Sequence, residues 1–152
     1  MHPHPPIRPD EPKLPALKVA PQRRDTPQGA TVNGDALWRG GYRQIEQTLA
    51  LLVHHPDVDA RTLQRFATAL DAHLNTADNL LYPVVESARK CALGRQRELN
   101  RRLRFLLAKA TQSGVDRASR RRRLRALESC FRQHARLDEA WIVPCLQSEL
   151  GA

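Results

Sequence analysis

Beyond Gly34 the apolar residues recur every three or four positions, which is the spacing of one face of an α-helix. Four such segments follow one another, separated by short polar loops near residues 53–59, 85–90 and 112–118. None shows the two-residue alternation of a half-buried strand. The four apolar stripes are Trp38, Tyr42, Ile45, Leu49 and Leu52; Leu63, Phe66, Leu70, His73, Ala77, Leu80 and Val84; Leu99, Leu103, Leu106 and Ala110; and Leu124, Leu127, Phe131, His134, Asp138, Trp141 and Cys145. Because short loops place sequential helices side by side, the pattern predicts an all-α, up-down-up-down antiparallel four-helix bundle over residues 34–152.

Three local signals refine these helices. Asp57 or Asp59 is a suitable N-cap for the second helix, since a short acidic side chain can accept a hydrogen bond from a free backbone N–H. Pro83 should kink the second helix or loosen its last turns, because proline removes a backbone donor. Ser113 and Gly114 mark the end of the third helix.

The first 33 residues differ in composition from the rest. Eight of the eleven prolines fall in residues 1–30, among Arg, Lys, His and Gln, with few apolar residues and no periodicity. Such a segment buries too little apolar surface to fold alone, so we expect residues 1–33 to form a disordered, basic arm. We expect no signal peptide and no membrane span, because both need longer apolar runs. The three cysteines lack CxxC spacing, which favours reduced thiols and a cytoplasmic location.

Two segments share a pattern built around a histidine. Residues 73–83 and 134–144 each begin with a histidine and end with a proline ten positions later, after an apolar run. In the second copy, Asp138 follows His134 by one helical turn and lies on the same face, whereas the first copy has Ala77 at that place. A buried carboxylate is costly unless it is paired or binds a metal. A histidine and a carboxylate one turn apart on a core-facing helix are how helical bundles build metal sites.

These segments resemble the hemerythrin-like HHE domain, whose motif runs from a histidine through an acidic residue at +4 or +5 to an apolar–aromatic pair and a proline. Residues 80–83 (Leu-Leu-Tyr-Pro) and 141–144 (Trp-Ile-Val-Pro) are similar to the end of that motif. Residues 42–45 (Tyr-Arg-Gln-Ile) and 100–103 (Asn-Arg-Arg-Leu) occupy the places where family helices 1 and 3 begin with a histidine. The resemblance covers about residues 35–150. It implies a four-helix bundle that, when complete, holds two irons through five histidines and two bridging carboxylates and binds oxygen or related small molecules.

Carried over residue by residue, this ligand set is incomplete. The matching positions are His73, His134 and Asp138. Histidine positions of the family are occupied by Tyr42 and Asn100, and one bridging carboxylate position by Ala77. The weaker metal-ligand candidates are Asp78, Glu139 and Tyr42. Asp78 could replace the missing carboxylate only if the helix is locally overwound or bulged, which the proline after it would permit.

Two hypotheses follow for the interior of the bundle. In one, His73, His134 and Asp138 bind a single metal ion, such as iron, with Tyr42 or water completing the shell. In the other, which we favour, no cofactor binds and a buried layer of hydrogen-bonding side chains takes the place of iron. The members of that layer are Tyr42, His73, Asn100, His134 and Asp138.

The charge of the chain is strongly basic and unevenly placed. The net charge is +9, and residues 89–125 hold fourteen Lys or Arg against two acids. The densest run, at the start of the fourth helix, is Arg120, Arg121, Arg122, Arg123 and Arg125. Arginine near a helix N-terminus opposes the helix dipole, so helix stability alone does not explain the run. It indicates an anionic partner, namely nucleic acid, an acidic protein surface or a membrane surface. The alternative is a solvated, arginine-rich surface, since 21 of the 25 basic residues are Arg.

We therefore expect a non-enzymatic binding or regulatory bundle. The first alternative is a protein that binds iron, in a mono- or dinuclear site, and senses or carries oxygen or a related diatomic ligand. The second is a basic module that binds nucleic acid or an acidic partner without sequence specificity. An enzyme has least support, because the sequence contains no Ser/His/Asp set, phosphate loop or paired acids. Cys91, Cys130 and Cys145 show no activating neighbours.

Overall fold

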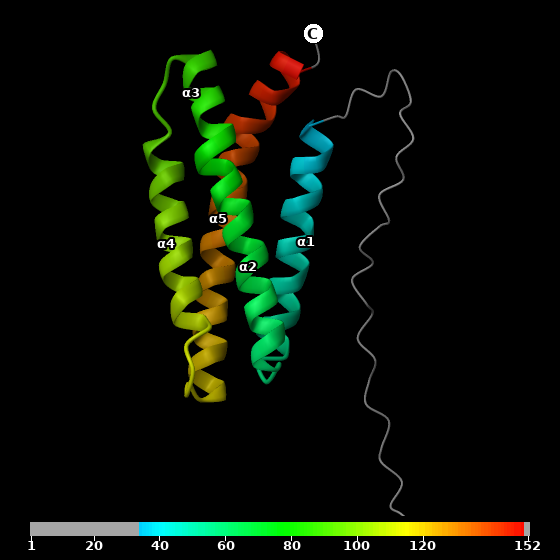
Figure 1. Cartoon of the computed structure of the whole chain (residues 1–152), viewed down its shortest axis with the longest axis vertical. Helices are drawn as coiled ribbons and strands as arrows, with labels where there is room; N and C mark the ends of the chain where they lie inside the picture. Colours follow the sequence, from blue (N-terminus) through cyan, green and yellow to red (C-terminus); the bar gives the residue numbers. More distant parts are fainter. Residues whose placement is uncertain (1–33, 151–152) are drawn as a thin grey trace, which may run out of the picture. The chain divides into compact units, whose positions relative to one another are not determined.

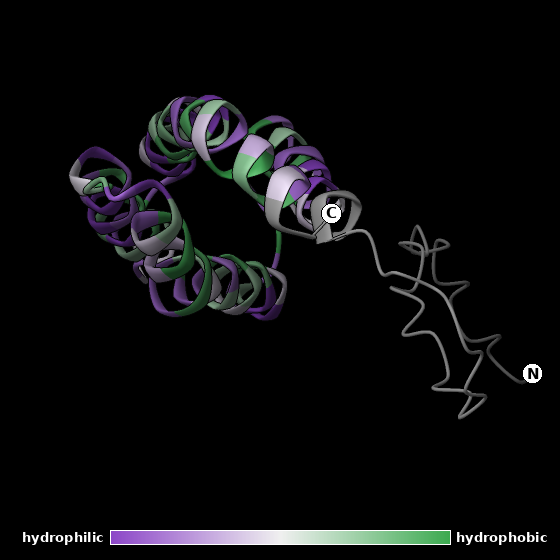
Figure 2. Ribbon diagram, turned by 90° about the horizontal axis from the view of Figure 1, so that it is seen from above, coloured by the Kyte–Doolittle hydropathy of each residue, from purple (hydrophilic) through white to green (hydrophobic). Residues whose placement is uncertain are grey.

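The computed structural model describes residues 34–150, and within that range all regular structure is helical. The elements are α1 (Gly34–His54), α2 (Ala60–Thr76), η1 (Ala77–Leu81), α3 (Tyr82–Arg89), α4 (Gly94–Ala110) and α5 (Arg117–Leu150). Because α2, η1 and α3 follow one another without a break, residues 34–150 form four helical rods lying side by side (Figure 1). Viewed from above, the rods surround a common centre (Figure 2). The all-α prediction is confirmed, and the predicted disordered arm lies outside the described residues.

The buried apolar side chains come from all four rods. Each rod contributes a fully buried leucine, namely Leu49, Leu70, Leu103 and Leu127. These belong to one cluster, and a second cluster gathers Trp38, Ala77, Tyr82, Val85, Leu93, Ile142, Val143, Cys145 and Leu146. Fully burying a leucine stabilises a fold by roughly 1.5–3 kcal/mol before entropy is counted. The predicted helical stripes therefore do form the core that holds the rods together.

Acidic residues begin two of the helices. Asp59 accepts a hydrogen bond from the Thr62 backbone N–H at 2.7 Å and starts α2. Asp116 accepts one from the Ser119 backbone N–H at 2.9 Å and starts α5. The backbone hydrogen bond from Thr62 lowers the pKa of Asp59, and hydrogen bonds from the side chain and then the backbone of Ser119 lower the pKa of Asp116, since they favour the ionised form. Of the two cap candidates for α2, Asp59 is the one that caps, whereas Asp57 pairs with Arg117 of α5 at 3.1 Å.

A single wide turn interrupts the second rod just before its proline. The segment η1 is π-helical, and the backbone N–H of Tyr82 reaches back five residues to the Ala77 carbonyl. Pro83 has no N–H, and its ring would crowd the carbonyl of Asn79 in a regular α-helix. A π-turn accommodates the ring by admitting one extra residue. The predicted loosening before Pro83 is confirmed, and it takes this form.

The wide turn explains one error in the predicted stripes. Leu80 and Val84 were placed in the core, but they are 64% and 52% exposed. Across the π-turn the next inward position after Ala77 comes five residues later, at Tyr82, and Tyr82 and Val85 are buried instead.

Two other stripe positions are displaced by one residue for a simpler reason, although Leu106 is half-buried and still packs against the core. Leu107 is buried in place of Leu106, and Ile142 in place of Trp141, which is 43% exposed. Positions three and four residues beyond a core residue both satisfy helical spacing. The sequence pattern alone could not choose between them.

The predictions on membrane spans and on the cysteines can be compared with the structure of residues 34–150. Among residues 34–150, no helix combines the length and the apolar character that crossing a membrane requires. The cysteines are free thiols, with Cys130 and Cys145 buried and Cys91 half-buried.

Candidate functional site

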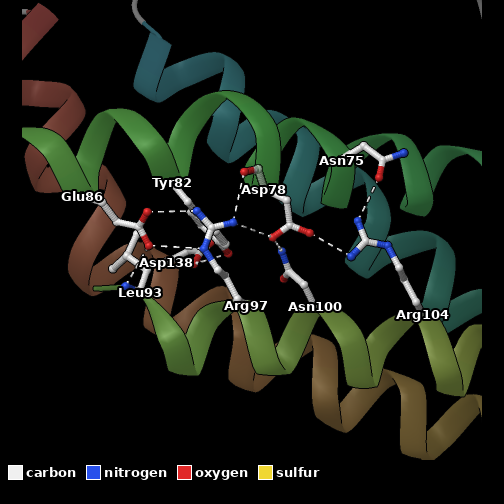
Figure 3. A network of polar contacts seen from close by, with 9 residues as sticks. All are labelled: Asn75, Asp78, Tyr82, Glu86, Leu93, Arg97, Asn100, Arg104 and Asp138. Carbon is white, nitrogen blue, oxygen red and sulfur yellow. Dashed lines mark hydrogen bonds and ion pairs between the residues drawn. The ribbon is translucent and has the colours of Figure 1, made fainter. Parts of the chain in front are cut away.

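The most unusual group in the interior is the carboxyl of Asp138 on α5, which is fully buried. The Tyr82 hydroxyl donates to it and lies 3.0 and 3.1 Å from its two oxygens (Figure 3). The Tyr42 hydroxyl, from α1, donates to Asp138 Oδ2. Two phenols from different rods therefore satisfy this carboxyl, and one of them, Tyr42, belongs to the predicted buried layer.

His134 completes this cluster from one turn earlier on α5. Its Nε2 lies 3.0 Å from the Tyr42 hydroxyl oxygen. A phenol has a single proton, and Tyr42 gives that proton to Asp138. The phenol oxygen must then accept from His134, which assigns the proton of this imidazole to Nε2. The result is a chain of hydrogen bonds from His134 through Tyr42 to Asp138.

Burial sets the charge state of these groups. It raises the pKa of Asp138 to about 7, although the hydrogen bonds from both tyrosines act in the opposite direction. It lowers the pKa of His134 to about 3, with His73 nearby adding to the effect. Burial also raises the pKa of Tyr42 and of Tyr82, and the Asp138 charge adds to this. At neutral pH His134 is uncharged, so its 3.6 Å approach to Asp138 Oδ2 is not an ion pair.

His73 lies beside this cluster in an aromatic environment. Its ring stacks on Trp38 with centroids 4.5 Å apart and meets the Tyr42 ring edge-on at 4.7 Å. The ring centroids of Phe131 and His134 lie 6.2 and 6.1 Å from that of His73. Burial lowers the pKa of His73 to about 4, so this imidazole is also neutral. Its Nε2 is buried without a hydrogen-bond partner among the described residues.

A second polar network forms between the second rod and α4. The Asp78 carboxylate accepts hydrogen bonds from Asn100 at 2.9 Å and from Arg104 at 2.8 Å (Figure 3). Arg97 donates to the Asp78 carbonyl at 3.2 Å and forms a two-pronged pair with Glu86, at 3.0 and 3.3 Å. This guanidinium lowers the pKa of the Glu86 carboxyl. Asp78 and Asn100 thus bind each other and do not reach Asp138.

The two networks meet at Tyr82. Its ring lies 5.5 Å from the Arg97 guanidinium, while its hydroxyl binds Asp138. The sequence interpretation missed both Tyr82 and Arg97 as members of the site. Tyr82 was counted as part of an apolar run, and a bulge at Ala77–Leu81 was considered only for its effect on Asp78. A five-residue step from Ala77 across such a bulge reaches Tyr82 and would have turned it inward.

The structure brings together only some of the predicted site residues. Tyr42, His134 and Asp138 are hydrogen-bonded, whereas His73 only packs against them. Asn100 belongs to the second network. Glu139, a weaker candidate, lies on the surface, 3.8 Å from Arg39.

Several arginines of the predicted anion-binding run bind the ends of other helices. Arg121 donates to the Val53 carbonyl in the last turn of α1 at 3.2 Å. Arg123 donates to the Lys109 carbonyl near the end of α4 at 2.7 Å, and Arg120 to the Gln112 carbonyl at 3.4 Å. Free carbonyls and the negative end of the helix dipole gather at these ends, so guanidinium groups stabilise them.

The stabilising role of Arg121 and Arg123 at these helix ends can be tested by stability measurements. We expect Arg121→Ala combined with Arg123→Ala to lower the free energy of unfolding by about 2 kcal/mol, because each loses a charged hydrogen bond to a backbone carbonyl. Urea denaturation measures it. The matched control, Arg122→Ala with Arg125→Ala, should change stability by less than about 0.5 kcal/mol. Equal losses in both double variants would contradict the assignment.

Comparison with known proteins yields one match. The family model described as the Hemerythrin HHE cation binding domain matches residues 38–146, which is more than half of the chain. The search of curated proteins and the search of solved structures found no match.

The residues at the matching positions do not fit a pair of irons. Both oxygens of Asp138 already accept hydrogen bonds from tyrosines, and His134 Nε2 is bound to Tyr42. Ala77 offers no ligand atom, and Asn100 donates to Asp78. Within residues 34–150, no three His, Cys, Asp or Glu side chains are gathered in a way that could hold a metal ion. By its sequence and its helical structure, the chain belongs to the hemerythrin HHE cation-binding domain family.

Proposed function

We propose that this protein is a non-enzymatic binding or regulatory bundle in which a hydrogen-bonded cluster takes the place of iron. Its four rods follow the up-down-up-down antiparallel order expected from the short loops. The observation that carries the proposal is the environment of Asp138, whose carboxyl accepts hydrogen bonds from Tyr42 and Tyr82. A carboxylate that bridges metal ions needs those same lone pairs.

Hydrogen bonds from the two tyrosines can replace a metal ion beside the buried Asp138 carboxyl. A buried carboxylate without a counter-charge costs several kcal/mol, and a metal normally supplies that charge. Here burial raises the pKa of Asp138 to about 7, and two phenols can donate hydrogen bonds to both the ionised and the protonated form of the carboxyl. Such a satisfied polar group fixes how α1, the second rod and α5 pack, because each contributes one member. The cluster therefore supports a structural role for the former metal position.

Metal analysis tests this proposal directly. Protein produced with added iron and then purified is expected to contain far less than one iron per chain and to show no visible absorption band. The control variants are His73→Ala and His134→Ala, which remove the two imidazoles that a metal would need. One tightly bound iron in the natural chain that is absent from both variants would overturn the proposal and favour the iron-binding alternative.

A further inference from the structure

The arginines of α5 fall into two groups with different surroundings. Arg121 and Arg123 bind helix ends, as described above. By contrast, Arg125 and Arg136 are exposed and make no hydrogen bond or ion pair within the part of the chain that the structure describes. Arg122 is also exposed and contacts only the Ser119 hydroxyl, at 2.9 Å. The second group has no structural task in the bundle.

These free arginines share one face of α5. At 100° per residue, positions 122, 125, 132 and 136 fall within an arc of about 80° and extend over about 21 Å. Arg132 lies on this face and is exposed, but it is not free, because it pairs with Glu128 at 2.9 Å and with Glu46 of α1 at 3.6 Å. Near the start of α5, a hollow in the surface is lined by Arg117, Ala118, Arg121, Arg122 and Arg125. Arg117 pairs with Asp57 and Arg121 binds the Val53 carbonyl, which leaves the guanidinium groups of Arg122 and Arg125 to bind a phosphate group in a two-pronged manner.

The adjoining helix α4 extends this basic surface. Its exposed cations are Arg95, Arg101, Arg102 and Lys109. Arg102 lies close enough to α5 to lower the pKa of the Cys130 thiol, against the larger effect of burial. We call the exposed cations of the two helices the basic ridge: Arg95, Arg101, Arg102, Lys109, Arg122, Arg125, Arg132 and Arg136. Two of these cations pair with acids: Arg101 with Glu98, and Arg132 with Glu128 and Glu46.

The composition of the ridge distinguishes between kinds of anionic partner. Interfaces with proteins are rich in aromatic side chains as well as arginine, so arginines with few aromatic neighbours match only part of that composition. The only large apolar side chain exposed on α4 in the described structure is Phe105, and Lys109 lies over its ring at 5.5 Å. Single-stranded nucleic acids are held by several aromatic platforms, whereas the described parts of α4 and α5 expose two large aromatic side chains, Phe105 and Trp141, at 61% and 43%. A straight row of arginines matches the regularly spaced phosphates of a duplex.

We propose that the basic ridge binds the phosphate backbone of double-stranded DNA without reading its sequence. This deepens the binding role proposed above by naming the partner and the surface. The two proposals fail separately, because DNA binding at this surface does not depend on whether the interior holds iron.

Salt dependence of binding tests the ridge with a matched control. The full chain is titrated into two 30-base-pair duplexes of unrelated sequence, at several salt concentrations from about 50 to 300 mM, and binding is followed by fluorescence anisotropy. The ridge variant carries Arg122→Gln, Arg125→Gln and Arg136→Gln. The control carries Arg61→Gln, Arg65→Gln and Arg89→Gln, three exposed arginines of α2 and α3. Both variants lower the net charge from +9 to +6 and keep residues 1–33 unchanged.

We expect the natural chain to bind both duplexes with equal affinity. The ridge variant should bind at least tenfold more weakly at low salt, and its slope of log K against log salt should be smaller by about 2.7, or 0.9 per lost phosphate contact. The control should keep the slope of the natural chain. No binding at the lowest salt, or an equal loss in both variants, would overturn the proposal. So would binding of an acidic peptide in preference to DNA.

Discussion

Replacing Asp138 by alanine should lower the free energy of unfolding by about 3–5 kcal/mol, the largest effect of any single change at the site. The substitution removes the acceptor of two tyrosine hydroxyls, and each buried donor left unpaired costs about 1–3 kcal/mol. For a domain of this size the loss corresponds to a fall in Tm of about 15 °C. Thermal unfolding followed by circular dichroism measures it.

The neighbouring carboxylate provides the control for this experiment. Glu139 is the next residue on α5, but its side chain is 68% exposed and lies 3.8 Å from Arg39. Glu139→Ala should therefore change stability by less than about 0.5 kcal/mol. In a Tyr82→Phe background, where one hydroxyl is already gone, Asp138→Ala should cost about 1 kcal/mol less than it does in the natural chain. If Asp138→Ala costs no more than Glu139→Ala, the tyrosine–carboxyl cluster does not stabilise the bundle.

Between about pH 5 and 6, the free energy of unfolding of the natural chain should rise by about 1 kcal/mol per pH unit. In the Asp138→Asn variant it should rise by about 2 kcal/mol per pH unit. The folded-state pKa values of His73 and His134, about 4 and about 3, lie below the ordinary 6.5. The contribution of these histidines to stability is present above pH 6.5 and is lost as the pH falls, because their imidazoles are protonated in the unfolded chain before they are protonated in the folded one. The pKa of Asp138 is raised from 3.8 to about 7, so its contribution is present at low pH and is lost as the pH rises.

These opposite slopes make the asparagine variant informative. Between about pH 5 and 6, the two histidines bind about two protons in the unfolded state, and Asp138 binds about one in the folded state. The slope of the natural chain therefore reflects a net difference of about one proton. Asp138→Asn removes the opposing term and leaves the histidines alone. Urea denaturation at several pH values gives both slopes, and the difference between them does not depend on how much the variant is destabilised overall. Identical slopes would show that Asp138 stays ionised in the folded protein.

The helical fold was predictable because periodicity is a property of each segment by itself. Leu49, Leu70, Leu103 and Leu127 stand in the predicted stripes and are fully buried. Asp138 could also be singled out from the sequence, since a carboxylate between core positions needs a partner.

Of the two partners of Asp138, Tyr42 was predicted as a member of the buried layer, whereas Tyr82 was not predictable by the same means. Tyr42 and Tyr82 come from other rods, and Tyr82 reaches the carboxyl only because the wide turn at Ala77–Leu81 changes the inward face. The run of arginines shows a similar limit. Its sequence indicates charge, whereas the proximity of Arg121 to Val53, 68 residues away, depends on how α1 and α5 meet. Contacts between distant residues build these clusters, and helical spacing does not report them.

The chain contains two tyrosines in all, and both donate to the same carboxyl. The ultraviolet absorption of phenol in the intact protein is therefore an intrinsic optical probe of one buried group. Since the pKa values of both tyrosines are raised, phenolate absorbance should stay absent at alkaline pH until the bundle opens. An alkaline titration would then record the opening of the core without any added label.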